Sequence, residues 1–260
     1  LAKILNIQLV PIEGDELGMK PERLDAVCRT NPMKGIYVSP SCNNPTAVTM
    51  DMNRRKEIAE VINKHGLILI EDDVYSFLAP SGFSPISHFV PERFVYILSI
   101  AKSLSSGIRV AFIAYANQFV EKITYGIFNL NVKTSALNAE IITELINTGA
   151  AERIIKTKRE ISQERNQIYL KYFQFNHPSE NPISFFRWLP LHKPWQLNQF
   201  EHVALTRGIH VYHSHRFLVK KDESPQFIRI SLTSPKDSDE LEKGLHILKG
   251  LLLESEEVLS

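Results

Sequence analysis

The stretch that decides the fold reads FVYILSIAKSLSSGIRVAFIAYA and runs from residue 94 to residue 116. Two apolar runs, at residues 94–100 and 109–116, flank a loop of mostly small residues that contains Lys102 and leads to Arg109. Runs of this length and composition are typical of strands. A lysine at a strand end is usually a solvated side chain, so the meaning of this loop depends on what the neighbouring strands carry.

Two earlier runs extend the same pattern. IYVS at residues 36–39 and LILI at residues 67–70 predict further strands, and the stretch between them predicts a helix. Strand, helix and strand in this order are typical of parallel strands joined by helical crossovers. The predicted helix has a candidate N-cap, a stop signal and one apolar face. These residues are Thr49 or Asp51 for the cap, Gly66 for the stop, and Ile58, Val61 and Ile62 for the face.

The second half of the chain predicts a different arrangement. Residues 135–149 and 151–173 predict two consecutive helices, the second of them charged enough to leave one face in solvent. Three short strand patterns and a final helix follow. They are FFRWLP, GIHVYHSHRF, FIRISLT, and a helix with Leu241, Leu245, Leu248 and Leu252 at helical spacing. We therefore predict an α/β fold, with a mostly parallel sheet in a large domain at residues 1–150 and a smaller α+β domain at residues 151–260.

Composition narrows the classes of function. The 260 residues are 43% hydrophobic and 23% charged, which is typical of one or two globular domains. The net charge of +1 is spread along the chain and gives no electrostatic footprint for nucleic acid or for a membrane surface. Two unpatterned cysteines, Cys28 and Cys42, predict neither a disulfide framework nor a zinc site. With no apolar span and no signal peptide, we expect a cytoplasmic protein.

Polar side chains follow three of the predicted strands. Open α/β sheets bind their ligands at the carboxyl ends of strands, so these positions are expected to share one site. Each has an ordinary explanation when taken alone: a turn at Asn44-Pro45, a helix cap by Asp72 or Asp73, and a solvated lysine. As a set they provide an amide, an acid followed by a tyrosine, and a loop with a hydroxyl, an amine and a guanidinium. The set is Asn44, Asp72, Tyr75, Ser99, Lys102 and Arg109.

These groups match the needs of one ligand, pyridoxal phosphate. Its aldehyde needs an amine for a Schiff base, its ring nitrogen a carboxylate, its phenolic oxygen hydrogen-bond donors, and its phosphate a hydroxyl and a guanidinium. In that order, the expected partners are Lys102, Asp72, Asn44 with Tyr75, and Ser99 with Arg109.

The motifs around these residues resemble those of the fold-type I aminotransferases, over essentially the whole chain. NNPT resembles the N-P-[TG] turn of that family, EDDVY its D-x-x-Y, and SIAKSLSSGIR its S-x-x-K-x(6)-R. The resemblance implies that Lys102 also carries the proton of a 1,3-shift. It further implies that Arg229, in FIRISLT, binds the carboxylate of the substrate, which suits the planar fork of an arginine.

A narrower resemblance concerns the segment FFRWLPLHKPWQLNQFEHVALTRGIHVYHSHRFLV. It is similar to a segment of the MocR group of GntR-type transcriptional regulators, in which a winged-helix DNA-binding domain precedes an aminotransferase-like sensor domain. Phe200, Ala204, Gly208 and Phe217 in this segment are expected to be core or turn residues, so the pattern indicates ancestry rather than chemistry. On this resemblance DNA would be bound only through a domain upstream of this chain.

Some features depart from the family pattern. Ala47 stands where the turn usually ends in glycine, and Ala101 where many relatives have a phosphate-binding hydroxyl. We interpret Leu1 as a cut end, with the stacking aromatic residue and the phosphate-binding helix start upstream of it. The expectation is that this chain holds pyridoxal phosphate weakly or not at all, whereas the intact protein holds it.

Three hypotheses about function follow. The chain is a sensor that binds an amino acid or amine through the cofactor, or a free-standing aminotransferase that passes an amino group to a 2-oxo acid, or a cofactor-free scaffold. The complete set of downstream cofactor residues argues against the scaffold. The resemblance also implies a homodimer.

Three histidines and two tryptophans need only structural explanations. His210, His213 and His215 alternate as on one face of a strand, but no acidic or cysteine ligand accompanies them, and we expect no metal. Trp188 and Trp195 are expected to pack in a core or between domains.

Overall fold

The computed structural model of the chain forms two compact units. It describes residues 2–174, 179–191, 199–219 and 226–257. One unit comprises Glu13–Asn44 and Val48–Glu160, and the other Leu1–Ile12, Pro45–Ala47 and Ile161–Ser260. The division falls inside helix α5 (Ala150–Tyr172), so one helix continues from the first unit into the second. The domain boundary expected after residue 150 stays a prediction.

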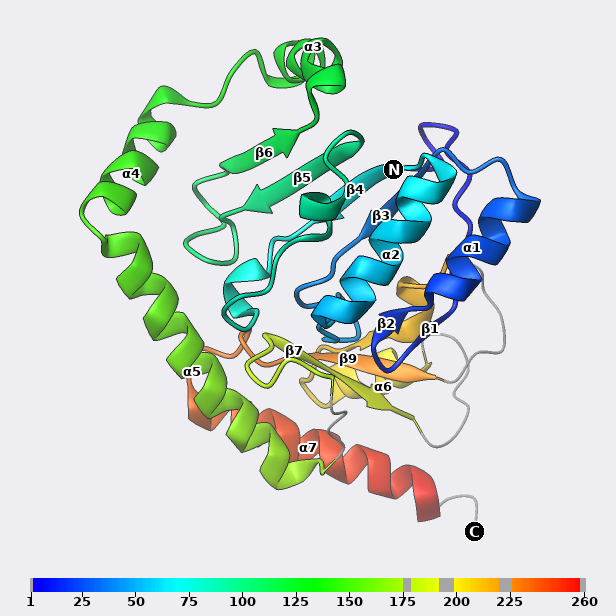
Figure 1. Cartoon of the computed structure of the whole chain (residues 1–260). Helices are drawn as coiled ribbons and strands as arrows, with labels where there is room; N and C mark the ends of the chain where they lie inside the picture. Colours follow the sequence, from blue (N-terminus) through cyan, green and yellow to red (C-terminus); the bar gives the residue numbers. More distant parts are fainter. Residues whose placement is uncertain (1, 175–178, 192–198, 220–225, 258–260) are drawn as a thin grey trace. The chain divides into compact units, whose positions relative to one another are not determined.

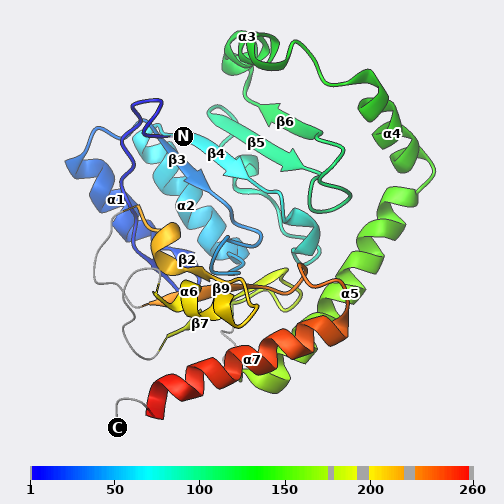
Figure 2. The same cartoon turned by 180° about the vertical axis from the view of Figure 1, so that it is seen from behind.

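The larger unit is built on a four-stranded sheet in the order β3-β4-β5-β6, seen from behind in Figure 2. Its strands are β3 (Gly35–Val38), β4 (Ile68–Asp72), β5 (Phe94–Ser99) and β6 (Ala111–Tyr115). The first three are parallel, which confirms the mostly parallel sheet, whereas β6 runs antiparallel to β5. The expectation of parallel strands fails at β6 because the connection from β5 is a loop, and a parallel return needs a crossover of a dozen or more residues.

Helices α1 (Pro21–Thr30) and α2 (Met52–His65) lie side by side (Figure 1). The N-cap of α2 is Asp51, whose Oδ1 accepts a hydrogen bond from the Arg54 amide at 2.8 Å, and the helix ends at Gly66 in the left-handed conformation with φ 63°. Both ends agree with the sequence signals. In β3 and β4 alternate residues are buried, whereas Tyr37 and Ile70 between them are exposed. The sheet therefore has one buried face and one more open face.

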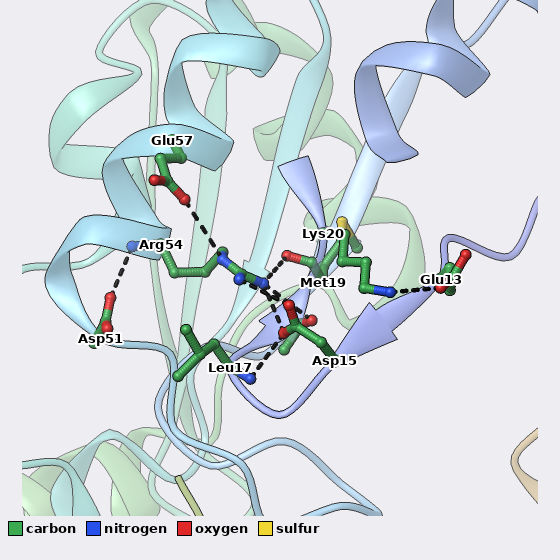
Figure 3. Close-up of polar contacts among 9 residues, drawn as sticks. Glu13, Asp15, Leu17, Met19, Lys20, Asp51, Arg54 and Glu57 are labelled. Atoms are coloured by element: carbon green, nitrogen blue, oxygen red, sulfur yellow. Dashed lines mark hydrogen bonds and ion pairs between the residues drawn. The ribbon is translucent and has the colours of Figure 1, made fainter. Parts of the chain in front are cut away.

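A short hairpin is fixed to α2 by one arginine (Figure 3). The hairpin consists of β1 (Gly14–Asp15) and β2 (Gly18–Met19). Arg54 reaches it from α2 and donates from Nη1 and Nη2 to the two Asp15 carboxylate oxygens, at 2.9 and 3.0 Å, and from Nη1 to the Met19 carbonyl at 2.9 Å. This bidentate pairing lowers the pKa of Asp15. Gly18 has φ 102°, a conformation that other residues rarely adopt, and a Cβ there would require Met50 to shift, since it would lie 2.9 Å from Met50 Cε.

Two further helices follow β6, namely α3 (Val120–Asn131) and α4 (Ala136–Asn147). Side chains of α3 are largely exposed, whereas Ile142 of α4 is buried against Ile100 and Val110 of the loop between β5 and β6. Short 3-10 turns complete this unit: η1 (Ser76–Leu78), η2 (Ile86–Phe89) and η3 (Asn117–Phe119).

The smaller unit has an antiparallel sheet in the order β7-β9-β8, formed by Phe186–Pro190, Phe227–Ser231 and Tyr212–His213. Helices α6 (Gln199–Thr206), α7 (Ser238–Glu257) and the second half of α5 supply the rest of its core. The expected apolar face of the last helix is present, with Leu241, Leu245 and Leu248 buried. Trp188 packs within this unit, stacked on Phe227 at 5.2 Å between ring centroids. Trp195 lies outside the described residues.

One local expectation is wrong. GIHVYHSHRF is a strand only at Tyr212–His213, because the His213 ring accepts a hydrogen bond from the His215 amide and the chain turns into η4 (Ser214–Arg216). The three histidines therefore do not line one strand face.

Candidate functional site

The parallel strands bring several of the predicted residues to one edge of the sheet. Asp72 is the last residue of β4, and Ser99 is the last residue of the neighbouring β5. Asp72 stands opposite Ile97, two positions before Ser99, so both side chains belong to the same face. Lys102 and Arg109 lie in the loop that follows, and Asn44 lies in the turn after β3. The structure thus places Asp72 and Ser99 at the ends of neighbouring parallel strands, and the shared ligand site stays a prediction.

Asp72 is oriented by a tyrosine that the sequence reasoning missed. Tyr37 Oη of β3 donates a 2.5 Å hydrogen bond to Asp72 Oδ2. Partial burial and this contact with a carboxylate raise the pKa of Tyr37 to about 12, so the phenol stays a donor. A signal existed: Tyr37 pairs with Ile70, which shares a strand face with Asp72, so strand alternation places the phenol beside the acid.

The two acids beside Asp72 have structural roles. Glu71 is buried and accepts hydrogen bonds from the amides of Ile86 and Ser87, each at 2.8 Å. Asp73 is buried and accepts one from Tyr96 Oη at 3.1 Å. Burial raises the pKa of both carboxyls. The ordinary explanation of helix capping does not apply, since the residue before η1 is Tyr75 and makes no side-chain cap. Asp72, half-buried, is the acid that faces the site edge.

The Lys102 loop packs against α4 through its apolar residues, while the Lys102 side chain is exposed to solvent. The Lys102 side chain is exposed, whereas Ile100 and Val110 are buried against α4. Within the loop, the Leu104 amide donates to the Ile100 carbonyl at 2.9 Å, and Ser99 Oγ accepts from the Ala101 amide at 3.3 Å. Apolar anchors therefore fix the backbone on both sides of an accessible lysine.

Arg109 adopts a backbone conformation that a non-glycine residue rarely takes. Its φ is +55°, in the left-handed region, and its side chain is exposed. Such conformations cost about 1–3 kcal/mol and are concentrated at functional sites. The preceding carbonyl, of Ile108, accepts a 2.8 Å hydrogen bond from Asn138 Nδ2 of α4, which helps to hold this conformation.

The remaining predicted residues are placed as follows. Asn44 is exposed, in a turn that the Asn43 amide closes on the Val48 carbonyl at 2.8 Å. Ala47 has φ 61°, the conformation for which the expected glycine is suited, and its burial makes its small size useful. Tyr75 is buried.

Arg229 belongs to β9 of the smaller unit, where its guanidinium carbon lies 4.6 Å from the centroid of the Phe186 ring.

The sequence of the chain is similar to those of aminotransferases and of transcriptional regulators. Residues 5–248 match the family described as aminotransferase class I and II. The chain belongs to this family. It is 34% identical, over 97% of its length and 54% of the relative, to the HTH-type transcriptional regulator YdeF of Bacillus subtilis. It is 26% identical, over 66% of its length and 45% of the relative, to the 2-aminoadipate transaminase of Thermus thermophilus. The chain thus spans about half the length of these relatives.

Solved structures show the same fold. The kynurenine aminotransferase of Pyrococcus horikoshii, solved in complex with PMP, superposes with a TM-score of 0.86 at 21% identity, covering 96% of this chain and 64% of that one. This likeness confirms the fold-type I α/β prediction. Among the described residues, no three histidine, cysteine or acidic side chains are grouped to hold a metal ion. Across the same residues, every helix is too short or too polar to cross a membrane.

Proposed function

We propose that this chain is the pyridoxal-phosphate-binding, ligand-sensing domain of a GntR/MocR-type transcriptional regulator. The observation that carries the proposal is the 34% identity to an HTH-type regulator along 97% of the chain, which belongs to the aminotransferase class I and II family. DNA binding would belong to a separate region of the intact protein, and the cytoplasm is the compartment in which such a regulator meets DNA.

The donor set at the sheet edge fits pyridoxal phosphate. Asp72 is a half-buried carboxylate already oriented by Tyr37, which suits a partner for a protonated ring nitrogen. Arg109 is held in a strained conformation with its guanidinium exposed, which suits a phosphate partner. The other proposed contacts are Lys102 to the aldehyde carbon, Asn44 and Tyr75 to the phenolic oxygen, and Ser99 to the phosphate.

When bound, the cofactor supplies an electron sink for bonds at the α-carbon of an amino acid. The residues of the chain bind and orient the cofactor and the amino acid. Asp72 keeps the proton on the ring nitrogen, Lys102 Nζ accepts or returns a proton next to the α-carbon, and Arg229 binds the carboxylate of an amino acid ligand. In a sensor, ligand binding need only shift the population of two conformations, with no turnover.

We further propose that the 260-residue chain by itself holds the cofactor weakly. Ala101 offers no hydroxyl to the phosphate, and each missing polar contact weakens binding by about 1 kcal/mol. An absorbance titration measures this directly. Tight, stoichiometric binding by this chain would contradict the weak-binding proposal while leaving the assignment of the site intact.

A free-standing aminotransferase is the second candidate, favoured by the 26% identity to 2-aminoadipate transaminase. The intact protein with pyridoxal phosphate distinguishes the two. Amino acids that shift the absorption band without forming a 2-oxo acid indicate a sensor. Full conversion to the pyridoxamine form with 2-oxo acid release indicates an enzyme. A wild-type spectrum without any band would contradict both and leave the scaffold hypothesis. Light scattering on the same sample tests the proposed homodimer.

A further inference from the structure

Two adjacent cations on helix α5 hold backbone carbonyls of the loops that carry the predicted site. Lys158 Nζ donates to the carbonyl of Lys102 itself at 3.0 Å and to that of Leu104 at 2.7 Å. One ammonium group therefore closes the turn of backbone from which the Lys102 side chain emerges.

The next residue of the helix makes the equivalent contact with the other loop. Arg159 Nη1 donates to the carbonyl of Phe77, in the η1 turn that directly follows Tyr75. Two consecutive residues of α5 thus contact the two loops that carry predicted site residues. Lys158 contacts the loop after β5, which carries Lys102, and Arg159 contacts the loop after β4, which carries Tyr75. All of these residues belong to the larger unit.

The Lys158 ammonium is placed where the solvent screens it only partly. Its side chain is half-buried, and burial, followed by the positive charge of Lys102, lowers the pKa of Lys158. Hydrogen bonds from a charged donor are stronger than those between neutral groups. The carbonyls of Lys102 and Leu104 offset the cost of placing a partly buried ammonium group near the positive charge of Lys102. Lys158 is therefore suited to fixing the loop after β5.

We propose that Lys158 and Arg159 are positioning residues that hold the Lys102 loop and the loop after Tyr75 in the arrangement that binds pyridoxal phosphate. The hydrogen bonds described above support the positioning of the two loops. The expected effect on pyridoxal phosphate binding rests on the proposed function. Neither residue touches the cofactor in this account. Each acts through the backbone of a neighbouring loop.

The first test needs no cofactor. Hydrogen exchange in Lys158→Met is expected to be at least about tenfold faster than in the wild type at the Leu104 amide, which bonds to the Ile100 carbonyl in this loop. Arg159→Met is expected to speed exchange at the Leu78 amide, which bonds to the Tyr75 carbonyl. The matched control is Lys156→Met, an exposed lysine on the same helix. Unchanged exchange in both variants would overturn the proposal.

The second test measures the consequence at the site. Lys158→Met is expected to weaken pyridoxal phosphate binding about tenfold, measured by absorbance titration, at a melting temperature equal to that of Lys156→Met. Lys158→Arg is expected to restore binding, because a guanidinium can also donate to two carbonyls. Wild-type affinity in Lys158→Met, or a loss that only follows a lower melting temperature, would contradict the positioning role. These titrations use the intact protein. If its wild type does not bind pyridoxal phosphate, the proposed function fails, and the exchange experiment still decides the geometry.

Discussion

The two halves of helix α5 make the same kind of contact in different surroundings. In the first half, the half-buried Lys158 and Arg159 donate to loop carbonyls of the larger unit. In the second half, Arg165 and Asn166 are buried and donate to carbonyls of the smaller unit, at 2.8 Å to Leu232 and 2.8 Å to Ser184. One helix thus uses polar side chains to fix loops in both units.

The polar side chains of the second half of α5 that make these contacts are buried, whereas those of the first half are only partly buried. Asn166 Oδ1 also accepts from Arg187 Nε at 2.7 Å, and Arg187 pairs with Glu180 with only 1% and 4% of the two side chains exposed. A buried polar group that loses its partner keeps its desolvation penalty, whereas a partly exposed one turns to water. We therefore expect the second half of α5 to control stability and the first half to control the geometry of the site.

The largest expected effect is on the buried ion pair. Arg187→Met leaves the Glu180 carboxylate buried without its cation, and the free energy of unfolding should fall by about 3–5 kcal/mol. Urea denaturation followed by circular dichroism measures it. The double variant Arg187→Met/Glu180→Leu should recover part of the loss. A loss below about 1 kcal/mol in the single variant would show that this region is not a buried network.

A smaller effect is expected at the helix residue that joins this network. Asn166→Ala removes the acceptor of Arg187 Nε and the donor to the Ser184 carbonyl, at a cost of about 1–3 kcal/mol. The matched control is Lys171→Ala, on an exposed position of the same helix. If both variants unfold at the same urea concentration, burial does not distinguish the two kinds of contact.

In the first half of the helix, Lys158→Met should change the free energy of unfolding by less than about 0.5 kcal/mol, although it weakens cofactor binding. The reason is that its carbonyl partners can turn to water when the cation is removed. Urea denaturation of this variant beside Lys156→Met checks the expectation. A loss as large as that of Asn166→Ala would erase the difference between the two halves.

The smallest effect concerns a charge cluster near the surface, which extends the comparison to a partly buried carboxylate with an exposed lysine partner. Asp25 accepts from Lys64 at 2.7 Å and from His65 Nε2 at 2.6 Å, and these contacts hold the pKa of its carboxyl well below the usual range. A lowered carboxyl pKa stabilises the fold above the unfolded-state value of about 4, and the contribution is lost as the pH falls below it.

Asp25→Asn should therefore be slightly less stable than the wild type at pH 7, and the difference should shrink in acid. Urea midpoints of both proteins at about pH 7, 5 and 3.5 test this, bracketing the unfolded-state pKa. A difference that stays constant down to the lowest pH would contradict the assigned cause.

Local patterns predicted most of the helices and strands. The ends of α2 at Asp51 and Gly66 follow from capping chemistry between near neighbours, and alternating or continuous apolar runs placed the strands. The same runs placed Asp72 and Ser99 at strand ends, as observed, and their grouping with Lys102 into one ligand site stays a prediction.

Contacts between distant segments could not be predicted in this way. Lys158 lies 56 residues from the carbonyl that it contacts, and Tyr37 lies 35 residues from Asp72. The contact of Lys158 depends on where α5 lies beside the loop after β5, and no local pattern indicates this. The contact of Tyr37 follows from strand alternation only once the register between β3 and β4 is known. The antiparallel β6 was missed for a related reason, since its direction depends on how the loop after Lys102 folds.

The central claim is that Lys102 is the attachment point of pyridoxal phosphate. Incubation with excess pyridoxal phosphate, borohydride reduction and peptide mass spectrometry locate the modified lysines. The account predicts that most of the label lies on Lys102, that it is lost in Lys102→Ala, and that it is retained in Lys156→Ala. Label spread evenly over the exposed lysines, or unchanged in Lys102→Ala, would contradict the claim.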